Sequence, residues 1–184
     1  MAFYLASKSP RRRELLKDAG FDFDILLSKT SDSVNEDVLP GESPENYVAR
    51  VTREKAKWGR KVAETERDLL LPVLAADTTV ALNGKIYGKP ADERKLLNSS
   101  KDFPRDKHTK VLTAVCLVDK EGKPRETLTK TFVTFRPLTD EEINSYIASG
   151  EAFDKAGRLR DSGISRSIRR KSRRFLQRRD RSAR

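Results

Sequence analysis

Hydrophobic and polar residues change their spacing along the chain, and this spacing separates expected strands from expected helices. Short apolar or alternating runs predict strands at residues 2–7, 21–28 and 69–77. Amphipathic helices are expected after Ser9 and after Ser43, because in both places a serine is followed by proline, an order typical of a helix start.

Beyond residue 77, the pattern favours pairs of strands. Asn83-Gly84 predicts a tight hairpin, and residues 110–119 and 126–138 read as two further strands around a turn at Glu121-Gly122. A capped helix is expected at residues 139–150. The order predicts an α/β fold with a mixed, twisted sheet flanked by helices, since hairpins argue against an all-parallel sheet.

Charge divides the chain unequally. Residues 158–184 hold twelve Lys and Arg residues and two acidic ones, and so carry +10 of the net charge of +11. Residues 1–157 are nearly balanced, with 27 basic and 26 acidic residues. A body with balanced charge has no long-range field that attracts polyanions. The change in charge after residue 157 predicts one domain at 1–157 followed by a basic tail at 158–184.

Other features narrow the setting. The single cysteine, Cys116, lies in the apolar run "VLTAVCLV", which favours a buried structural thiol over a reactive one. No apolar run is long enough to span a membrane, and the amino terminus is unlike a secretory signal, so we expect a cytoplasmic protein. One histidine, His108, and no CxxC motif argue against a zinc site of the usual kind.

The stretch "SKSPRRRE" is the first candidate for chemistry. A strand here delivers serines and arginines to a helix start, where free N–H groups and the helix dipole favour an anion. The donors that could bind phosphate are Ser7, Ser9, Arg11 and Arg12. A solvated first helical turn is the alternative, although cations at this end oppose the helix dipole.

A second group of residues could hold a metal. Asp77 is expected at the end of a buried strand, where a carboxylate is costly unless it is paired, protonated or metal-bound. It is therefore a candidate metal ligand or general base, or else a turn cap, and Lys89 is a candidate phosphate contact. Glu36 could supply a second ligand, although it and Lys55 are singly typical of solvated surface. Together these residues suggest hydrolysis at phosphorus by a metal-activated water.

Five blocks carry a family resemblance: "LASKSPRRRELLKDAG", "LPGESPENYVARVTREKA", "LAADTTVALNGKIYGKP", "VLTAVCLV" and "GEAFDKAG". In order and spacing they resemble the Maf proteins, which are nucleoside triphosphate pyrophosphatases with the Maf/Ham1-like, ITPase-like fold. The resemblance covers roughly residues 3–157. It implies a divalent cation, Mg²⁺ or Mn²⁺, and a reaction that turns a nucleoside triphosphate into the monophosphate and pyrophosphate.

The Ser-Pro-Arg-Arg and Ala-Asp-Thr forms are similar to the subfamily that acts on dTTP and UTP. The resemblance implies that Asp77 accepts the proton of the attacking water, and that Arg11 and Thr78 determine specificity. It also implies a set of phosphate and metal contacts at Ser7, Arg12, Glu36, Lys55 and Lys89. Homodimers are usual in such families.

Two segments depart from the family pattern. Residues 98–110 lack the usual Leu-Ser-Gly-x-x-His-x-Val, and after Gly157 the expected Gly-Tyr-Gly-Ile-Gln is absent. Residues 158–163 can be written CGG TTA CGG GAT TCA GGG, which read from the second base gives Gly-Tyr-Gly-Ile-Gln. In the same frame, residues 174–184 give the family's later block, Gly-Ser-Tyr-Ser-Gly-Val-Ile-Gly-Leu-Pro.

We therefore interpret residues 158–184 as a frameshifted segment, and we expect it to be disordered and to impair activity and stability. Its charge would bind nucleic acid only non-specifically, without regard to sequence. Three alternatives stay open: a pyrophosphatase for CTP or modified pyrimidine nucleotides, a basic-tailed nucleic-acid-binding protein, and an inactive nucleotide-binding protein.

Overall fold

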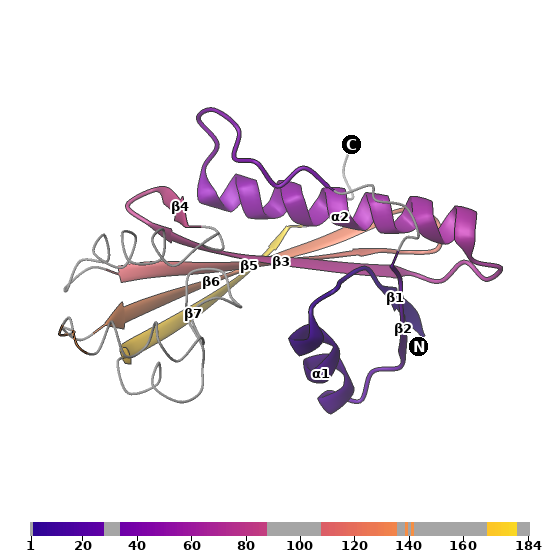
Figure 1. Cartoon of the computed structure of the whole chain (residues 1–184), viewed down its shortest axis with the longest axis horizontal. Coiled ribbons are helices and arrows are strands. Elements are labelled where there is room, and N and C mark those ends of the chain that lie inside the picture. The colour runs from indigo at the N-terminus through magenta and orange to yellow at the C-terminus, as the bar shows by residue number, and fades with distance from the viewer. Residues whose placement is uncertain are drawn as a thin grey trace. The chain divides into compact units, whose positions relative to one another are not determined.

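The computed structural model describes residues 2–27, 34–87, 108–135, 139 and 141, and the backbone of residues 169–179 (Figure 1). Its helices and strands, in chain order, are β1 (Phe3–Leu5), α1 (Pro10–Asp18), β2 (Phe23–Ile25), α2 (Pro44–Glu66), β3 (Val73–Leu82), β4 (Lys85–Tyr87), β5 (His108–Val118), β6 (Pro124–Phe135) and β7 (Arg169–Arg179).

The described strands form one mixed sheet with the order β2-β1-β3-β5-β6-β7, while β4 pairs with β3 outside this path. Strand β1 pairs in parallel with both β2 and β3. Strand β4 returns antiparallel to β3, with Leu82 opposite Lys85. The expected α/β class with a mixed sheet is confirmed.

Contacts divide the chain into two compact units. The first comprises Met1–Asp77, Thr113–Leu128 and Gln177–Arg184, and the second comprises Thr78–Leu112 and Thr129–Leu176. The first unit contains both helices and most of the candidate site. The expected domain boundary after residue 157 lies outside the described residues and stays a prediction.

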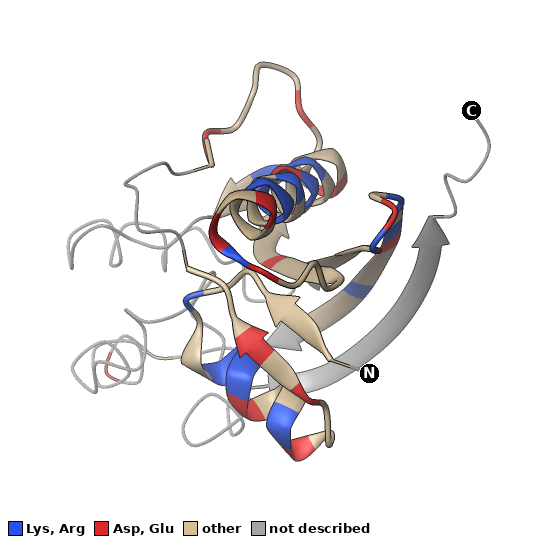
Figure 2. Cartoon of the chain, turned by 90° about the vertical axis from the view of Figure 1, so that its right-hand side faces the viewer, with Lys and Arg blue, Asp and Glu red and all other residues tan. Residues whose placement is uncertain are grey.

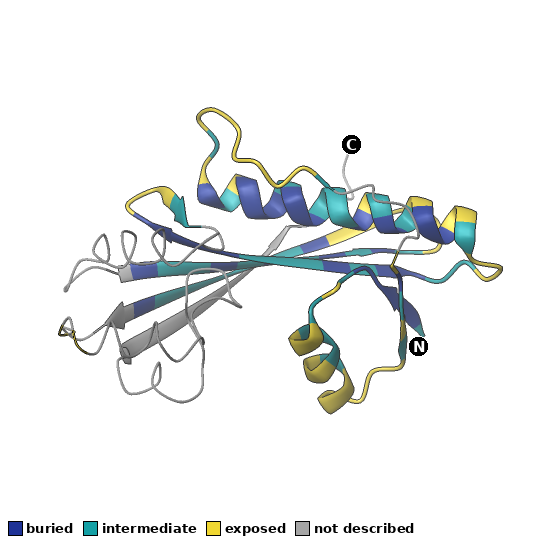
Figure 3. Cartoon of the chain, in the orientation of Figure 1, coloured by how far each residue is buried: buried dark blue, intermediate teal, exposed yellow. Residues whose placement is uncertain are grey.

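Helix α1 begins at Pro10 and ends where Gly20, with φ of 75°, takes the left-handed conformation that favours glycine. Ser9 lies at the N-cap as expected, but its side chain makes no capping bond; its backbone N–H donates to the Ser7 hydroxyl. No residue of α1 is buried, and Figure 3 colours this helix mainly as exposed.

Helix α2 is long and amphipathic. The Ser43 hydroxyl accepts the Asn46 N–H at 3.2 Å, so the expected cap at Ser43 is confirmed. The buried face of the helix packs on the sheet of the first unit, as the dark blue turns of α2 in Figure 3 show. This face and the sheet form a hydrophobic cluster; its buried members are Tyr4, Ala6, Leu26, Ala56, Val62, Ala63, Val73, Ala75, Cys116 and Val118.

Two strands differ from their expected bounds. We expected a strand that ends at Asp77, but β3 runs unbroken from Val73 to Leu82, so Asp77 lies within it. The carboxylate does not end the strand because a lysine of α2 neutralises it, as described below. The expected strand at 21–28 is also shorter than predicted, because only Phe23–Ile25 pair with β1.

Both expected turns are confirmed. Asn83 and Gly84 have positive φ angles of 50° and 80°, as a two-residue hairpin between β3 and β4 requires. Gly122, with φ of 83°, lies in the turn between β5 and β6, where the Asp119 N–H donates to the Lys123 carbonyl at 3.1 Å. The expected helix at 139–150 lies almost wholly outside the described residues.

The carboxyl-terminal strand β7 lies within the segment that we expected to be disordered. Residues 169–179 lie beside β6, at the end of the strand order of the described sheet. A strand in this place needs only backbone hydrogen bonds from one neighbour, and edge strands tolerate a high density of charged residues. The rest of residues 158–184 lies outside the described part of the chain.

Candidate active site

The turn between β1 and α1 gathers polar groups around the Ser7 hydroxyl. This hydroxyl accepts hydrogen bonds from the Ser9 N–H and from Arg12 Nη1, each at 3.2 Å. Arg12 is half-buried, whereas Arg11 is exposed. Burial lowers the pKa of Arg12, and the negative charges of Asp77 and Glu36 oppose that shift. Arg12 therefore lies within the electrostatic reach of both acids.

Lys55 joins the two acids that we predicted as metal ligands. Its Nζ lies 2.8 Å from Glu36 Oε1 and 2.8 Å from Asp77 Oδ1. The side chain of Asp77 is 14% exposed and that of Lys55 is 20% exposed, while that of Glu36 is 58% exposed. Lys55, which the sequence alone placed on the surface, therefore links a sheltered carboxylate of β3 to an exposed one in a loop.

The local sequence explains why these groups meet. Lys55 precedes the fully buried Ala56 on α2, so the packed face of the helix fixes where the lysine can reach. Asp77 lies on β3, which runs beneath this helix (Figure 1). Glu36 comes from the irregular loop before Ser43, which the hydrogen bonds of α2 hold in place.

Two residues of the site neighbourhood were missed by the sequence analysis. The Tyr47 hydroxyl donates to the Glu36 carbonyl oxygen at 2.9 Å, and Arg50 Nη2 donates to the Asp37 carbonyl oxygen at 2.7 Å. A spacing of three residues puts both side chains on one side of α2. It does not show that the acidic loop returns to that side, so no local signal could have found these contacts.

The other predicted residues are not all brought to this point. Thr78 directly follows Asp77 in β3 and is half-buried. Ser9 contributes its backbone N–H to the Ser7 hydroxyl. Lys89 lies outside the described residues. The structure therefore places Lys55, Glu36 and Asp77 in direct contact, with Arg12 acting on both acids through its charge.

The donor set suits a hard divalent cation. Among the described residues there is no cluster of three or more His, Cys, Asp or Glu side chains that could hold a metal. Two carboxylates that converge on one point are nevertheless what Mg²⁺ commonly takes from a protein, because water and substrate phosphates complete its shell. Glu36 and Asp77 fit this pattern, since both reach the same ammonium group.

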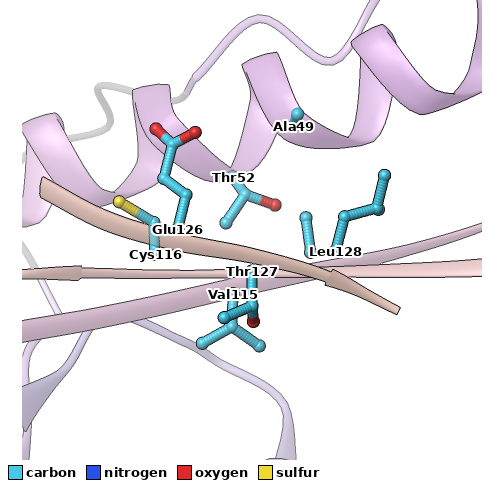
Figure 4. Close-up of a pocket in the computed structure, with 8 residues that line it drawn as sticks. Ala49, Thr52, Val115, Cys116, Glu126, Thr127 and Leu128 are labelled. Carbon is cyan, nitrogen blue, oxygen red and sulfur yellow. The ribbon is translucent and has the colours of Figure 1, made fainter. Parts of the chain in front are cut away.

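A small cavity elsewhere in the first unit is not part of this site. It measures ≈ 10 Å³ and lies between α2 and the strands β5 and β6. In Figure 4, Cys116 and Glu126 point toward α2, while Val115 and Thr127 point away from it. The space holds one water molecule at most, so we assign it to packing.

Two observations bear on the sequence-based expectations for this unit. Cys116 is free and buried, which confirms the structural thiol. No helix in the described ranges 2–27, 34–87 and 108–135 is both long and apolar enough to cross a membrane.

Figure 2 shows Lys and Arg residues along both α1 and α2, where they alternate with acidic residues.

Comparison with known proteins agrees with these features. The family model described as "Maf-like protein" matches residues 2–171. The chain belongs to the Maf family. The match includes the Ser7 turn, Glu36, Lys55 and Asp77, which are the residues that the structure brings toward one another. The family resemblance found in the sequence is therefore confirmed.

Curated Maf relatives share a name. The dTTP/UTP pyrophosphatase of Dechloromonas aromatica (strain RCB) is 44% identical over 161 residues, which are 85% of this chain and 79% of that protein. The dTTP/UTP pyrophosphatase of Escherichia coli O157:H7 is 44% identical over 163 residues, 89% of this chain and 78% of that protein. The protein of the same name from Ralstonia nicotianae is 43% identical over 156 residues, 84% of this chain and 75% of that protein.

One solved structure is also similar. It is a nucleoside-triphosphatase / dITP/XTP pyrophosphatase from Mycobacterium abscessus, with 19% sequence identity and a TM-score of 0.48. The similarity covers 73% of this chain and 74% of that one.

Proposed function

We propose that this Maf protein is a nucleoside triphosphate pyrophosphatase that hydrolyses dTTP and UTP to the monophosphate and pyrophosphate. The observation that carries the proposal is the contact of Lys55 with both Asp77 and Glu36, beside Arg12. A hydrolase acting on an oligophosphate needs cations for the phosphates and a carboxylate for the water, and this group offers both. The shared name of the relatives supports the same activity.

In this proposal Asp77 acts as the general base. Water attacks at phosphorus, the bond between the α- and β-phosphates breaks, and pyrophosphate leaves while Asp77 takes the proton of the water. Asp77 suits this role because it is mostly sheltered yet has an exposed fraction of 14% through which water can reach it. Lys55 holds the carboxylate in place through a 2.8 Å contact.

The phosphates are bound by the turn before α1 and by basic side chains. Ser7 and Ser9 lie at a helix amino terminus, where N–H groups and the helix dipole favour an anion. Positive charge is added by Arg11, Arg12, Lys55 and Lys89. Arg11 and Thr78 contact the nucleobase of the substrate and determine which nucleotide is hydrolysed. Glu36 and Asp77 would hold a divalent cation, Mg²⁺ or Mn²⁺, which when bound neutralises charge that develops on the phosphates.

We further propose that the enzyme acts in the cytoplasm, as a homodimer, on a free nucleoside triphosphate. Nucleic acid binds only non-specifically, through the positive charge of residues 158–184.

The decisive experiment measures pyrophosphate release from dTTP, UTP and CTP with Mg²⁺ or Mn²⁺. We expect Asp77→Asn to lower the rate about 100-fold or more, because the amide accepts no proton from water. Asp24→Asn is the matched control, since Asp24 is an exposed aspartate on β2, and it should keep full activity. Equal activity in the unchanged chain and Asp77→Asn would contradict the role of Asp77, and faster release from CTP would favour the other pyrimidine specificity.

A second comparison tests the frameshift. A version with the reading frame restored after Gly157 should release pyrophosphate faster than the chain as it stands, since it regains the missing Gln of the family. Equal, measurable rates in both versions would show that the change of frame does not impair activity. Nucleotide binding without release of pyrophosphate by the restored version would indicate an inactive nucleotide-binding protein.

A further inference from the structure

The loop that carries Glu36 has little burial of its own. Residues 35–41 are exposed, and so is most of the Glu36 side chain, at 58%. An exposed loop without apolar anchors samples many conformations, and each one moves the carboxylate. The 2.8 Å contact between Glu36 and Lys55 therefore needs something that holds the loop.

Tyr47 holds this loop at Glu36 itself. Its ring is buried at 8% exposure in the second turn of α2, and its hydroxyl donates to the Glu36 carbonyl oxygen at 2.9 Å. Burial raises the pKa of this hydroxyl, and the negative charges of Asp77 and Glu36 raise it further, so it stays a donor. The backbone of Glu36 is thus tied to a rigid helix.

Arg50 holds the loop on both sides of Glu36. Its guanidinium donates to the carbonyl oxygens of Asn35, at 3.3 Å, and Asp37, at 2.7 Å. It also forms a two-pronged pair with the Glu42 carboxylate, at 2.7 and 3.0 Å. The hydrogen bonds from Arg50 lower the pKa of Glu42, and this pair raises the pKa of Arg50, so both groups stay charged.

The two side chains also support each other. The Arg50 guanidinium lies over the Tyr47 ring, 5.7 Å from its centre, in a cation–π contact. Three successive carbonyl groups, those of residues 35–37, therefore receive hydrogen bonds from one pair of residues on α2. Of the side chains in this group, only Glu36 is directed to Lys55.

We propose that Tyr47 and Arg50 are positioning residues, which fix the loop so that the Glu36 carboxylate stays beside Asp77 and completes the cation site. This inference rests on the proposed function for its activity readout, and on the Glu36–Lys55–Asp77 geometry for the rest. Neither residue touches the reacting atoms; both act through Glu36.

The test uses two conservative variants of the full chain. Tyr47→Phe keeps the buried ring and removes only the hydroxyl, and Arg50→Lys keeps the charge but cannot reach three carbonyl and carboxylate groups at once. Glu54→Gln is the matched control, because Glu54 contacts Arg50 Nη1 at 3.3 Å but does not belong to the loop. Thermal unfolding confirms that each variant folds.

Two quantities are measured: the Mn²⁺ dissociation constant without nucleotide, by titration calorimetry, and the rate of pyrophosphate release. We expect Tyr47→Phe to weaken Mn²⁺ binding and to slow release about 3- to 10-fold each, the effect of one hydrogen bond. Arg50→Lys should cost more, about 10-fold or above, because it breaks several bonds. Glu54→Gln should change neither quantity.

A double-mutant cycle separates positioning from a general structural effect. In a Glu36→Gln background, Tyr47→Phe should have no further effect on Mn²⁺ binding, because the group that it positions is gone. Additive losses would overturn the proposal, and so would wild-type values in Tyr47→Phe and Arg50→Lys, or a failure of the unchanged chain to bind Mn²⁺. Weakened Mn²⁺ binding in a chain that releases no pyrophosphate would instead refute the proposed function and leave the positioning role standing.

Discussion

At the scale of single residues, Cys116 shows how the packed interface sets chemistry. Burial raises the pKa of its thiol to about 12, the nearby negative charge of Glu126 adds to the shift, and Arg53 and Lys57 oppose it. Arg53 is itself paired with Glu126 through two hydrogen bonds, at 2.5 and 2.9 Å. The thiol is therefore kept neutral inside a charged neighbourhood.

This shift predicts a pH dependence of stability. Above the ordinary thiol pKa of 9.0, Cys116 ionises in the unfolded chain but not in the folded one, up to a pH of about 12. Its contribution is complete below pH 9.0 and is lost progressively between these two values. Urea unfolding of the chain and of Cys116→Ala should show their free energies of unfolding drawing together from about pH 7 to about pH 10. A constant difference would contradict a raised pKa.

Much of the site could be predicted residue by residue, because each side chain's chemistry limits what it can do there. A carboxylate in a buried strand needs a partner, which singled out Asp77. Its partner could not be named, because Lys55 lies 22 positions away and only the packing of α2 on the sheet brings the two together. The roles of Tyr47 and Arg50 also depend on where an irregular loop returns, and no local spacing fixes that.

At the scale of elements, α2 organises the first unit. Its first turns hold the acidic loop, and its middle supplies Lys55. Arg60, farther along the helix, donates to the carbonyl oxygens of Asp119 and Lys120, at 2.7 and 2.9 Å. These two residues lie in the turn between β5 and β6. One helix thus fixes the position of three segments that are distant in sequence. Any shift of α2 on the sheet should move all of them together.

Gly59 of α2 packs closely against Ala6 and Val73, so a substitution there tests how tightly the helix is seated. A Cβ on Gly59 would lie 2.7 Å from the Ala6 Cβ and 2.9 Å from Val73 Cγ1. We expect Gly59→Ala to destabilise the chain by about 1–3 kcal/mol, since the clash outweighs the helix propensity gained. Lys61→Ala, at an exposed position of the same helix, is the control. Urea unfolding measures both, and a gain in stability at Gly59→Ala would refute the close packing.

Elements with strong local signals were predicted well, and those decided by distant partners were not. The cap at Ser43 and the turn at Asn83-Gly84 follow from the preferences of single residues. The length of β3 does not follow from such preferences. Asp77 reads as the end of a strand unless its partner, Lys55, is known. Likewise, β7 depends on hydrogen bonds from its neighbour in the sheet rather than on its own composition.

At the scale of the whole molecule, the charge of the chain is concentrated in its last segment. Strand β7 has the sequence RRKSRRFLQRR and lies last in the strand order of the described sheet. Like charges on such a strand discourage a second copy from pairing with it.

The Lys55 bridge predicts how the whole molecule responds to metal removal. A chelator should abolish pyrophosphate release and leave the melting temperature unchanged within about 1 °C, because Lys55 already pairs with both carboxylates in the absence of metal. Lys55→Met should lower the melting temperature by several degrees, the cost of an unpaired acid of about 1–2 kcal/mol. Mg²⁺ should restore part of this loss, whereas Lys61→Met, at an exposed position, should change nothing. Unfolding by the chelator alone would contradict the bridge.

This internal bridge also bears on the life of the protein in a cell. A chain that carries its own counter-charge can be synthesised and folded before any metal reaches it, unlike domains whose fold is assembled by the ion. The incoming cation must then compete with an ammonium group that is tethered in place and cannot be diluted away. The chain itself would thus set the metal concentration at which it switches from a resting to a working form.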